Sequence, residues 1–338
     1  MNELQQLVDD IGRRSFDARS RHRGVPDSFD EALWRDLEET GLSRLVSSGD
    51  AGPAESAVVL AGLAKHAAAV PIAETDLLAA WLALQAGIAI PETGPLTVAV
   101  ADAQRQGDRV VGSAHDVPWP RPGRVLLAAR TDRGLHVGLT DEVGDADHNL
   151  AGEPRGSLVI DMPATDLQTL DLRVADELTR RGAWARCVQM VGALDAARDL
   201  TVAHTSERVQ FGRALSKFQA VQHSLAAMAG ETERARAAVT LAVAAASDYG
   251  FGSPVTDYAV TVAKVAVGRA VGPVTTIAHQ LHGAIGVTVE HRLWLVTMRA
   301  RSWVDDFGST ARYARRLGRI ALSADAPWDV VVSCPGPR

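Results

Sequence analysis

Hydrophobic positions along the 338 residues follow two different periods, helical at both ends of the chain and strand-like in the middle. Residues 29–41 repeat apolar side chains at one-turn spacing, and Gly41 is the expected end of that helix. The Ala- and Leu-rich residues 54–69 and 73–86 continue the helical spacing. The pattern therefore predicts an N-terminal helical domain over residues 1–92.

The middle of the chain changes to short runs of apolar and β-branched residues, separated by Gly, Pro and Asp. Such runs between turn-forming residues are typical of strands. They predict a small β-domain over residues 93–172, with strands at 96–101, 109–113, 124–129, 134–139 and 157–160.

Helical spacing returns over residues 173–324, where two sets of apolar residues each fall on one helix face. These sets are Trp184, Val188, Val191 and Leu194, and Phe218, Val221, Leu225 and Met228. Ser253 followed by Pro254 predicts the start of a long helix that runs to His282. The remaining residues, 325–338, are rich in proline, and we predict an irregular tail. The fold class that follows is α+β, in the order helices, β-domain, helices.

Composition limits the class of protein. The net charge is −6, from 41 acidic and 35 basic residues, which does not favour binding to nucleic acid or to an anionic membrane. The two cysteines, Cys187 and Cys334, provide neither a disulfide framework nor a metal quartet. Residues 1–6 lack the basic and apolar regions of a signal peptide, and the apolar stretch at 77–90 is too short to span a bilayer. We therefore expect a cytoplasmic protein without a membrane span.

Two segments carry chemistry that suits a ligand with phosphates. The first runs Arg208-Val-Gln-Phe-Gly-Arg-Ala-Leu-Ser-Lys-Phe-Gln219, in which Arg208 can clamp a pyrophosphate and Gly212 allows a tight turn. The second, Gln280-Leu-His-Gly-Ala-Ile-Gly286, can bring backbone N–H groups against a second phosphate or a ribose. Taken alone, each is also what an ordinary helix end looks like.

Together, the two segments resemble the acyl-CoA dehydrogenase family: 208–219 is similar to its flavin-contacting loop and 280–286 to its dinucleotide-contacting turn. The resemblance implies FAD, an oligomer, and a fold in which a β-domain lies between an N-terminal helical domain and a C-terminal four-helix bundle. The residues it places at FAD are Arg208, Gln210, Phe211, Leu215, Phe218, Gln219, Gln280, Leu281, Gly283 and Ala284. Helix packing is an equal alternative for Phe211, Leu215 and Phe218, and Ser309 could either contact the cofactor or cap a helix.

The chain departs from the family where the catalytic base is expected. Family members remove an α-proton from an acyl-CoA with a carboxylate, but here Phe307 occupies the usual base position and Gly182 the other known one. Asp306, one residue earlier, is the nearest carboxylate, although adjacent acids at a helix end are usually solvated. The N–H of Phe307 needs no particular side chain, and the family uses the equivalent amide to bind the thioester oxygen.

A second departure lies in the β-domain and the N-terminal turn. The family's acidic, glycine-rich substrate-side segments are reduced to Val98–Asp102 and Ser47–Pro53. This pattern resembles the short, base-lacking subunit of the heteromeric acyl-CoA dehydrogenases that actinobacteria use on steroids. It implies a catalytic partner subunit in a heterotetramer, a bulky acyl-CoA substrate and an electron-transfer flavoprotein or similar acceptor. A self-sufficient homo-oligomer that uses Asp306 and a flavin-free scaffold remain alternatives.

Other sites are not indicated. His282 and His291 flank the second motif but have no Asp or Cys at ligand spacing, so no metal site is predicted. The chain has no Gly-x-Ser-x-Gly elbow of a hydrolase, and the glycines after Gln280 lack the preceding strand of a Rossmann site.

Overall fold

The computed structural model describes residues 3–19, 24–141, 144 and 146–332, and they divide into two compact units. The first, which we call the helical unit, comprises the described parts of 1–24, 53–68 and 183–338. The second, the sheet unit, comprises those of 25–52 and 69–182. Helix α5 (Leu172–Glu207) contributes residues to both. The boundaries of the three predicted domains remain a prediction.

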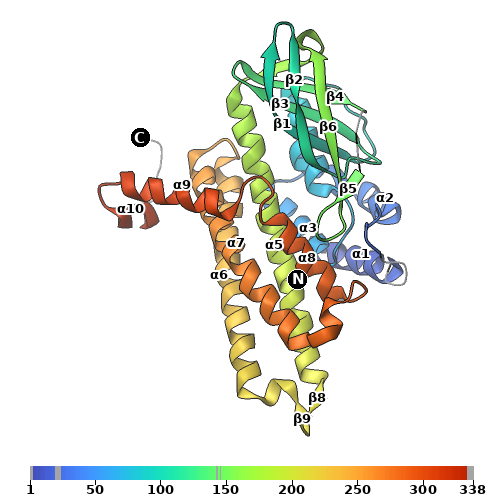
Figure 1. Ribbon diagram of the computed structural model, residues 1–338, viewed down its shortest axis with the longest axis vertical. Coiled ribbons are helices and arrows are strands. Elements are labelled where there is room, and N and C mark those ends of the chain that lie inside the picture. The colour runs from blue at the N-terminus through green and yellow to red at the C-terminus, as the bar shows by residue number, and fades with distance from the viewer. Residues whose placement is uncertain (1–2, 20–23, 142–143, 145, 333–338) are drawn as a thin grey trace. The chain divides into compact units, whose positions relative to one another are not determined.

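The helical unit is built around α5 from Ala183 onward and two further long helices, α6 and α7, which lie side by side in Figure 1. Its described helices besides α5 are α1 (Glu3–Arg19), α3 (Pro53–Lys65), α6 (Gln219–Tyr249), α7 (Pro254–His282), α8 (Arg292–Trp303), α9 (Thr310–Ser323) and α10 (Pro327–Val332). The set predicted from Trp184 to Leu194 is buried, whereas of the set from Phe218 to Met228 only Met228 is fully buried. As predicted, Ser253 caps α7, because its Oγ accepts from the Val255 N–H at 3.2 Å.

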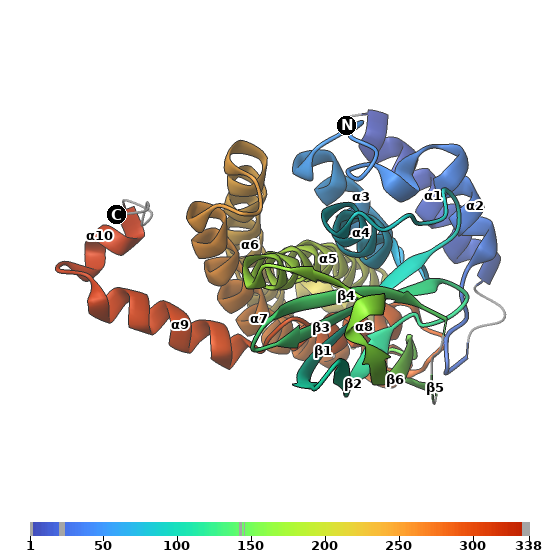
Figure 2. The same cartoon turned by 90° about the horizontal axis from the view of Figure 1, so that it is seen from above.

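Helix α9 contacts α7, where Arg316 pairs with Asp257, and α10 follows α9 along the chain (Figures 1 and 2). The prediction of an irregular tail over 325–338 is wrong in its described part, which holds α10. Pro327 suits the first turn of a helix, and the Tyr258 hydroxyl donates to the Val330 carbonyl at 2.8 Å, which fixes the segment to α7. Cys334 lies outside the described residues.

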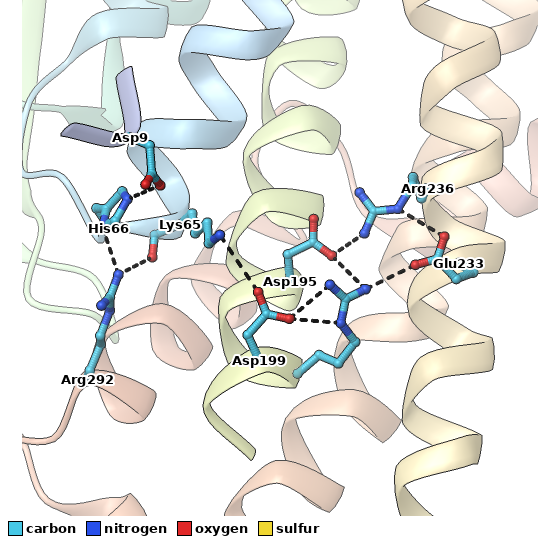
Figure 3. Close-up of polar contacts among 9 residues, drawn as sticks. Asp9, Lys65, His66, Asp195, Asp199, Glu233, Arg236 and Arg292 are labelled. Atoms are coloured by element: carbon cyan, nitrogen blue, oxygen red, sulfur yellow. Dashed lines mark hydrogen bonds and ion pairs between the residues drawn. The ribbon is translucent and has the colours of Figure 1, made fainter. Parts of the chain in front are cut away.

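Polar contacts join α1, α3 and α8 within the helical unit (Figure 3). His66, which is buried, lies 2.7 Å from Asp9 through Nε2 and 2.7 Å from the Arg292 Nη2 through Nδ1. Because the guanidinium can only donate, Nδ1 accepts and Nε2 carries the proton toward Asp9. Burial lowers the pKa of His66, which favours this neutral form.

The sheet unit holds a seven-stranded sheet of order β5-β6-β2-β1-β3-β4-β7. Its strands are β1 (Leu96–Gln106), β2 (Arg109–Pro118), β3 (Arg124–Thr131), β4 (Gly134–Thr140), β5 (Ala146–His148), β6 (Pro154–Pro163) and β7 (Gln168–Leu170). β1 pairs parallel with β3 and antiparallel with β2, in a register that opposes Val98 to Leu126 and Ala103 to Gly112. All five predicted strands are present, while the short edge strands β5 and β7 were not predicted.

Three helical segments, two short 3-10 turns, Leu42–Arg44 and Ala164–Asp166, and the start of α5 complete the described part of the sheet unit. The predicted helix over 29–41 is α2 (Glu31–Glu39), followed by Gly41 at φ 72°. The helix expected over 73–86 is a buried π-helical segment, Glu74–Ala80, that continues as α4 (Trp81–Ala86). The spacing of apolar residues therefore predicted where this helix lies, but not that its first part is π-helical.

One segment of the described chain, Pro254–Val287, is long and apolar enough to cross a membrane by length and composition alone. Of its most apolar window, 56% is buried inside the protein. The core helix of a helical bundle passes the same test, so this is weak support for a membrane span.

Candidate functional site

The first motif folds into a tight hairpin between α5 and α6 (Figure 1). Its strands are β8 (Val209–Gln210) and β9 (Arg213–Ala214), and the two residues between them have positive φ, 53° at Phe211 and 81° at Gly212. Positive φ at both central residues is the geometry of a type I′ turn, which favours Asn-Gly rather than Phe-Gly. Phe211 is thus held in a strained conformation, and 91% of it is exposed.

The hairpin is ordered by its own contacts. The Leu215 N–H donates to the Arg208 carbonyl at 2.9 Å, and Leu215 itself is half-buried in a 3-10 turn, Leu215–Lys217. The Phe218 ring meets the Phe211 ring edge-on at 6.2 Å, and the Arg213 guanidinium lies 4.1 Å from the centre of the Phe218 ring. The alternative of ordinary helix packing fits Leu215 and Phe218, but it does not fit the exposed Phe211.

The second motif lies at the end of α7 and in the 3-10 segment that follows, Gly283–Val287. Gly283 has φ 69°, and no atom lies within 4 Å of the place where its Cβ would be, so a ligand can approach the backbone there. His282 stacks on His204 of α5 at 4.4 Å between ring centres. Because His204 lies one turn before Arg208, this stack brings the two motifs to the same end of the helical unit.

Three polar side chains of these motifs are exposed and make no hydrogen bond or ion pair with any residue that the structure describes. They are Arg208 after α5, Gln219 at the start of α6 and Gln280 in the last turn of α7. Gln210 and Ala284 are also exposed, and Leu281 is half-buried. An unpaired guanidinium and two unpaired amides beside an open glycine backbone fit the phosphates and sugar of FAD.

The turn that contains the base position, Val304–Ser309, connects α8 to α9. Phe307 has φ 55°, an uncommon conformation for a residue of its type, and its carbonyl accepts from the Tyr313 hydroxyl at 3.0 Å. Asp306 Oδ2 lies 2.8 Å from Nε of Arg186, and only 18% and 4% of the two side chains are exposed. The nearest carboxylate to the base position is therefore bound in a partly buried ion pair.

Lys264, in the middle of α7, also binds this turn and was not singled out from the sequence. It is fully buried, and its Nζ donates to the carbonyls of Val304 and Asp306 at 2.8 Å each. Burial lowers its pKa. A signal was present, since a lone lysine in the apolar run Tyr258–Val267 is unusual and needs buried acceptors.

Ser309 caps α9, because its Oγ accepts from the Arg312 N–H at 3.2 Å. Its neighbour Thr310 lies against Gly268, where a Cβ would come within 3.1 Å of the Thr310 Cβ. Gln280 is twelve residues farther along α7, or about 18 Å at helical rise. The structure therefore does not bring Ser309 together with the two motif segments, and its predicted contact with the cofactor stays a prediction.

Histidines gather at the end of α7, where His291 meets His282 at 5.3 Å between ring centres. Burial lowers the pKa of His282 to about 4, and the pKa of His291 is lowered for the same reason. Among the described residues no group of three or more His, Cys, Asp or Glu is placed to hold a metal ion.

A groove of about 490 Å³ lies between α1, α3, α5 and α6 and was not predicted from the sequence. Its walls are mostly small apolar residues, such as Ala57, Ala61, Val188 and Val239, and a few charged residues also line it. None of the predicted cofactor residues lines it.

In the sheet unit, β1 runs without interruption from Leu96 to Gln106, and the chain turns only at Gly107, with φ 62°. The segment Val98–Asp102 therefore lies inside a continuous strand and contains no turn. The reduced substrate side expected from the sequence stays a prediction.

Comparison with known proteins establishes the family. The family model described as "Acyl-CoA dehydrogenase, C-terminal domain" matches residues 172–312. The protein "Acyl-CoA dehydrogenase IpdE2" of Mycolicibacterium smegmatis is 30% identical over 302 residues, which cover 86% of this chain and 88% of that protein. The chain belongs to the acyl-CoA dehydrogenase family, whose members are flavin-dependent oxidoreductases.

Solved structures confirm the predicted fold. The structure described as "Tcur3481-Tcur3483 steroid ACAD G363A variant" is similar with a TM-score of 0.83 and 26% identity, over 95% of this chain and 97% of that one. The "ChsE4-ChsE5 complex from Mycobacterium tuberculosis" has the same fold, with a TM-score of 0.82 and 24% identity over 96% and 99%. The likeness to an acyl-CoA dehydrogenase of the steroid-degradation type, inferred from the motifs, is thus confirmed.

Proposed function

We propose that this chain is the FAD-binding subunit of a heteromeric acyl-CoA dehydrogenase, which forms a double bond between the α- and β-carbons of a bulky acyl-CoA, and that a partner subunit supplies the base. The observation that carries this proposal is the state of the base position. Phe307 cannot accept a proton, and the neighbouring carboxylate of Asp306 already accepts from Arg186.

The ion pair argues against a self-sufficient enzyme. A general base contributes about 10²–10⁴ in rate only when it can reach the proton that it removes. Asp306 would have to leave Arg186, and a buried guanidinium that loses its carboxylate is destabilised by about 3 kcal/mol or more. Gly182, at the other known base position, has no side chain at all.

The unpaired polar side chains of the two motifs support binding of FAD. Arg208 can hold the pyrophosphate bidentately, Gln219 and Gln280 can bind sugar or phosphate oxygens, and the open backbone at Gly283 can approach a phosphate. When bound, FAD supplies the acceptor for the hydride that leaves the β-carbon. A flavin-free scaffold has no need for such an arrangement, so we place it second.

The distance along α7 supports a site shared between chains. The turn that carries Phe307 lies near the middle of α7, whereas Gln280 lies about 18 Å away at its end. One chain therefore offers two separate partial sites, each of which a second chain can complete. We propose a heterotetramer of two such chains and two catalytic subunits.

The relatives indicate the substrate class. The 26% identical structure is described as a steroid acyl-CoA dehydrogenase. Its description names two proteins, Tcur3481 and Tcur3483. On this basis we propose a steroid-derived acyl-CoA as substrate. Membership of the family further leads us to propose an electron-transfer flavoprotein or similar acceptor and a cytoplasmic location.

The decisive test is an acid-to-amide exchange in each subunit of the purified complex. Asp306→Asn should leave turnover within a few-fold of wild type, although the loss of the ion pair lowers the midpoint of thermal unfolding. The exposed neighbour gives the matched control, Asp305→Asn, which should change neither quantity. Replacing the base carboxylate of the partner should abolish turnover, since a true base is worth about 10²-fold or more. Loss of turnover in Asp306→Asn with FAD still bound would instead locate the base in this chain.

A further inference from the structure

Two buried cations hold the turn that carries Phe307. Lys264 is fully buried, and its Nζ lies 2.8 Å from the carbonyl oxygens of Val304 and Asp306. Arg186 is only 3% exposed, and its Nε lies 2.8 Å from the Asp306 carboxylate. Lys264 binds the backbone of the turn, whereas Arg186 binds a side chain on it.

Burial of a charged lysine is unfavourable, and apolar side chains would fill the same space without that penalty. The atoms that Nζ contacts directly are neutral carbonyls, and the carboxylates of Asp305 and Asp306 act on the amine only through space. The amine therefore acts on those two peptide groups, and one of them includes the base position.

The carbonyl of Asp306 and the N–H of Phe307 belong to the same peptide group. In a trans peptide the C=O and N–H bonds point in opposite directions, so a carbonyl fixed on Lys264 directs the Phe307 N–H away from it. Hydrogen bonding at the oxygen also withdraws charge from the nitrogen and strengthens the N–H as a donor, by about 10–30%. Among the residues that the structure describes, this N–H has no acceptor.

The rest of the turn is fixed by separate contacts. The Phe307 carbonyl accepts from the Tyr313 hydroxyl, and the Gly308 N–H donates to the Asp305 carbonyl at 3.1 Å. These contacts hold the peptide groups on either side, and they are consistent with the positive φ of Phe307. The Phe307 N–H is left as the donor that the turn presents.

We infer that Lys264 is a positioning residue, which orients and polarises the Asp306–Phe307 peptide so that the Phe307 N–H donates to the carbonyl oxygen of an acyl thioester. This inference rests on the proposed acyl-CoA function. It explains why a chain without a base keeps a buried lysine and a strained backbone at the base position: the turn still binds the carbonyl group of the substrate.

The test uses the purified, flavin-loaded complex and cinnamoyl-CoA labelled with ¹³C at the thioester carbonyl. Isotope-edited infrared spectroscopy reports the downshift of the carbonyl stretch on binding, and titration gives the affinity. Removal of one oxyanion donor lowers turnover about 10²–10³-fold. Polarisation by a second hydrogen bond strengthens such a donor by about 10–30%, which is the same share of the corresponding free energy. Lys264→Met should therefore weaken binding roughly 2- to 10-fold and reduce the downshift, with FAD content unchanged.

Tyr313→Phe is the matched control, because it removes a hydrogen bond from the same turn but not from the Asp306–Phe307 peptide. It should leave the carbonyl downshift as in wild type, whereas general loosening of the turn would change both variants alike and overturn the inference. Where Lys264→Met does not fold, Lys264→Gln keeps a neutral donor and should give an intermediate downshift. A wild-type complex that holds FAD but binds no thioester also overturns this inference, while absence of FAD contradicts the proposed function itself.

Discussion

Gly192 of α5 lies so close to α3 that no side chain can be added there. A Cβ on Gly192 would be 2.8 Å from the Ala61 carbonyl carbon, and nearer still to its oxygen, whereas ordinary contacts begin at 3.4 Å. The two helices belong to the same unit, and the obstacle is backbone, which cannot rotate aside. We therefore expect Gly192→Ala to force α3 and α5 apart by at least about half an ångström.

Overpacking of this kind costs about 1–3 kcal/mol. Alanine is also the better helix former, by about 0.5–1 kcal/mol, and that gain offsets part of the cost. Gly230 of α6 is the control, because nothing lies within 4 Å of the place where its Cβ would be. Gly230→Ala therefore measures the gain in helix stability without overpacking. At about 2–4 °C per kcal/mol, Gly192→Ala should lower the thermal midpoint by several degrees, and Gly230→Ala should raise it by a degree or more.

Scanning calorimetry of the assembled complex, with wild type and both variants side by side, measures these midpoints. Equal midpoints for the two alanine variants would refute the close approach of α3 and α5. A lowered midpoint for Gly230→Ala would refute the open surroundings assigned to that residue.

Three further predictions concern the two motifs. Burial lowers the pKa of His282 from 6.5 to about 4, so protonation favours the unfolded chain. The contribution of His282 to the free energy of unfolding is therefore fully present above pH 6.5 and falls by up to about 3 kcal/mol as the pH drops toward 4. Denaturant unfolding at several pH values should show this decrease, and His282→Gln should reduce it. Phe211→Asn should relieve the strained type I′ turn and raise the thermal midpoint of the isolated chain, while it lowers the FAD content of the complex; an unchanged FAD content would remove Phe211 from the site. Arg208→Ala should lower the FAD content sharply, whereas the exposed Arg234 gives a control, Arg234→Ala, that should retain it.

Much of the fold follows from local pattern. The five predicted strands are all present because each is several residues long and bounded by turn-forming residues. Edge strands β5 and β7 have three residues each and little alternation, so their sequence gives no signal, and pairing with β6 and β4 forms them. The hairpin β8–β9 was missed for a related reason, since Phe-Gly is not a usual type I′ sequence.

The candidate site could be predicted only in part. Arg208, Gln280 and the lack of a carboxylate at Phe307 were singled out through the resemblance of the motifs to the family, and the contact of the two side chains with FAD stays a prediction. The ion pair of Arg186 with Asp306 joins residues 120 positions apart. No spacing rule pairs such residues, because their contact depends on how α5 and α8 pack, and the same holds for the contact of Lys264 with the turn.

If this chain binds FAD but depends on a partner for the base, the visible absorbance of the flavin reports both properties. A saturated acyl-CoA is added, without any electron acceptor, to the purified wild-type complex. The same addition is made to a complex in which the base carboxylate of the partner subunit has been replaced by the corresponding amide. We predict that both preparations are yellow, release FAD on denaturation, and differ in that only the wild-type complex is bleached. A colourless wild-type complex would show that FAD is not bound, and bleaching that persists without the base of the partner would show that the base is not in the partner.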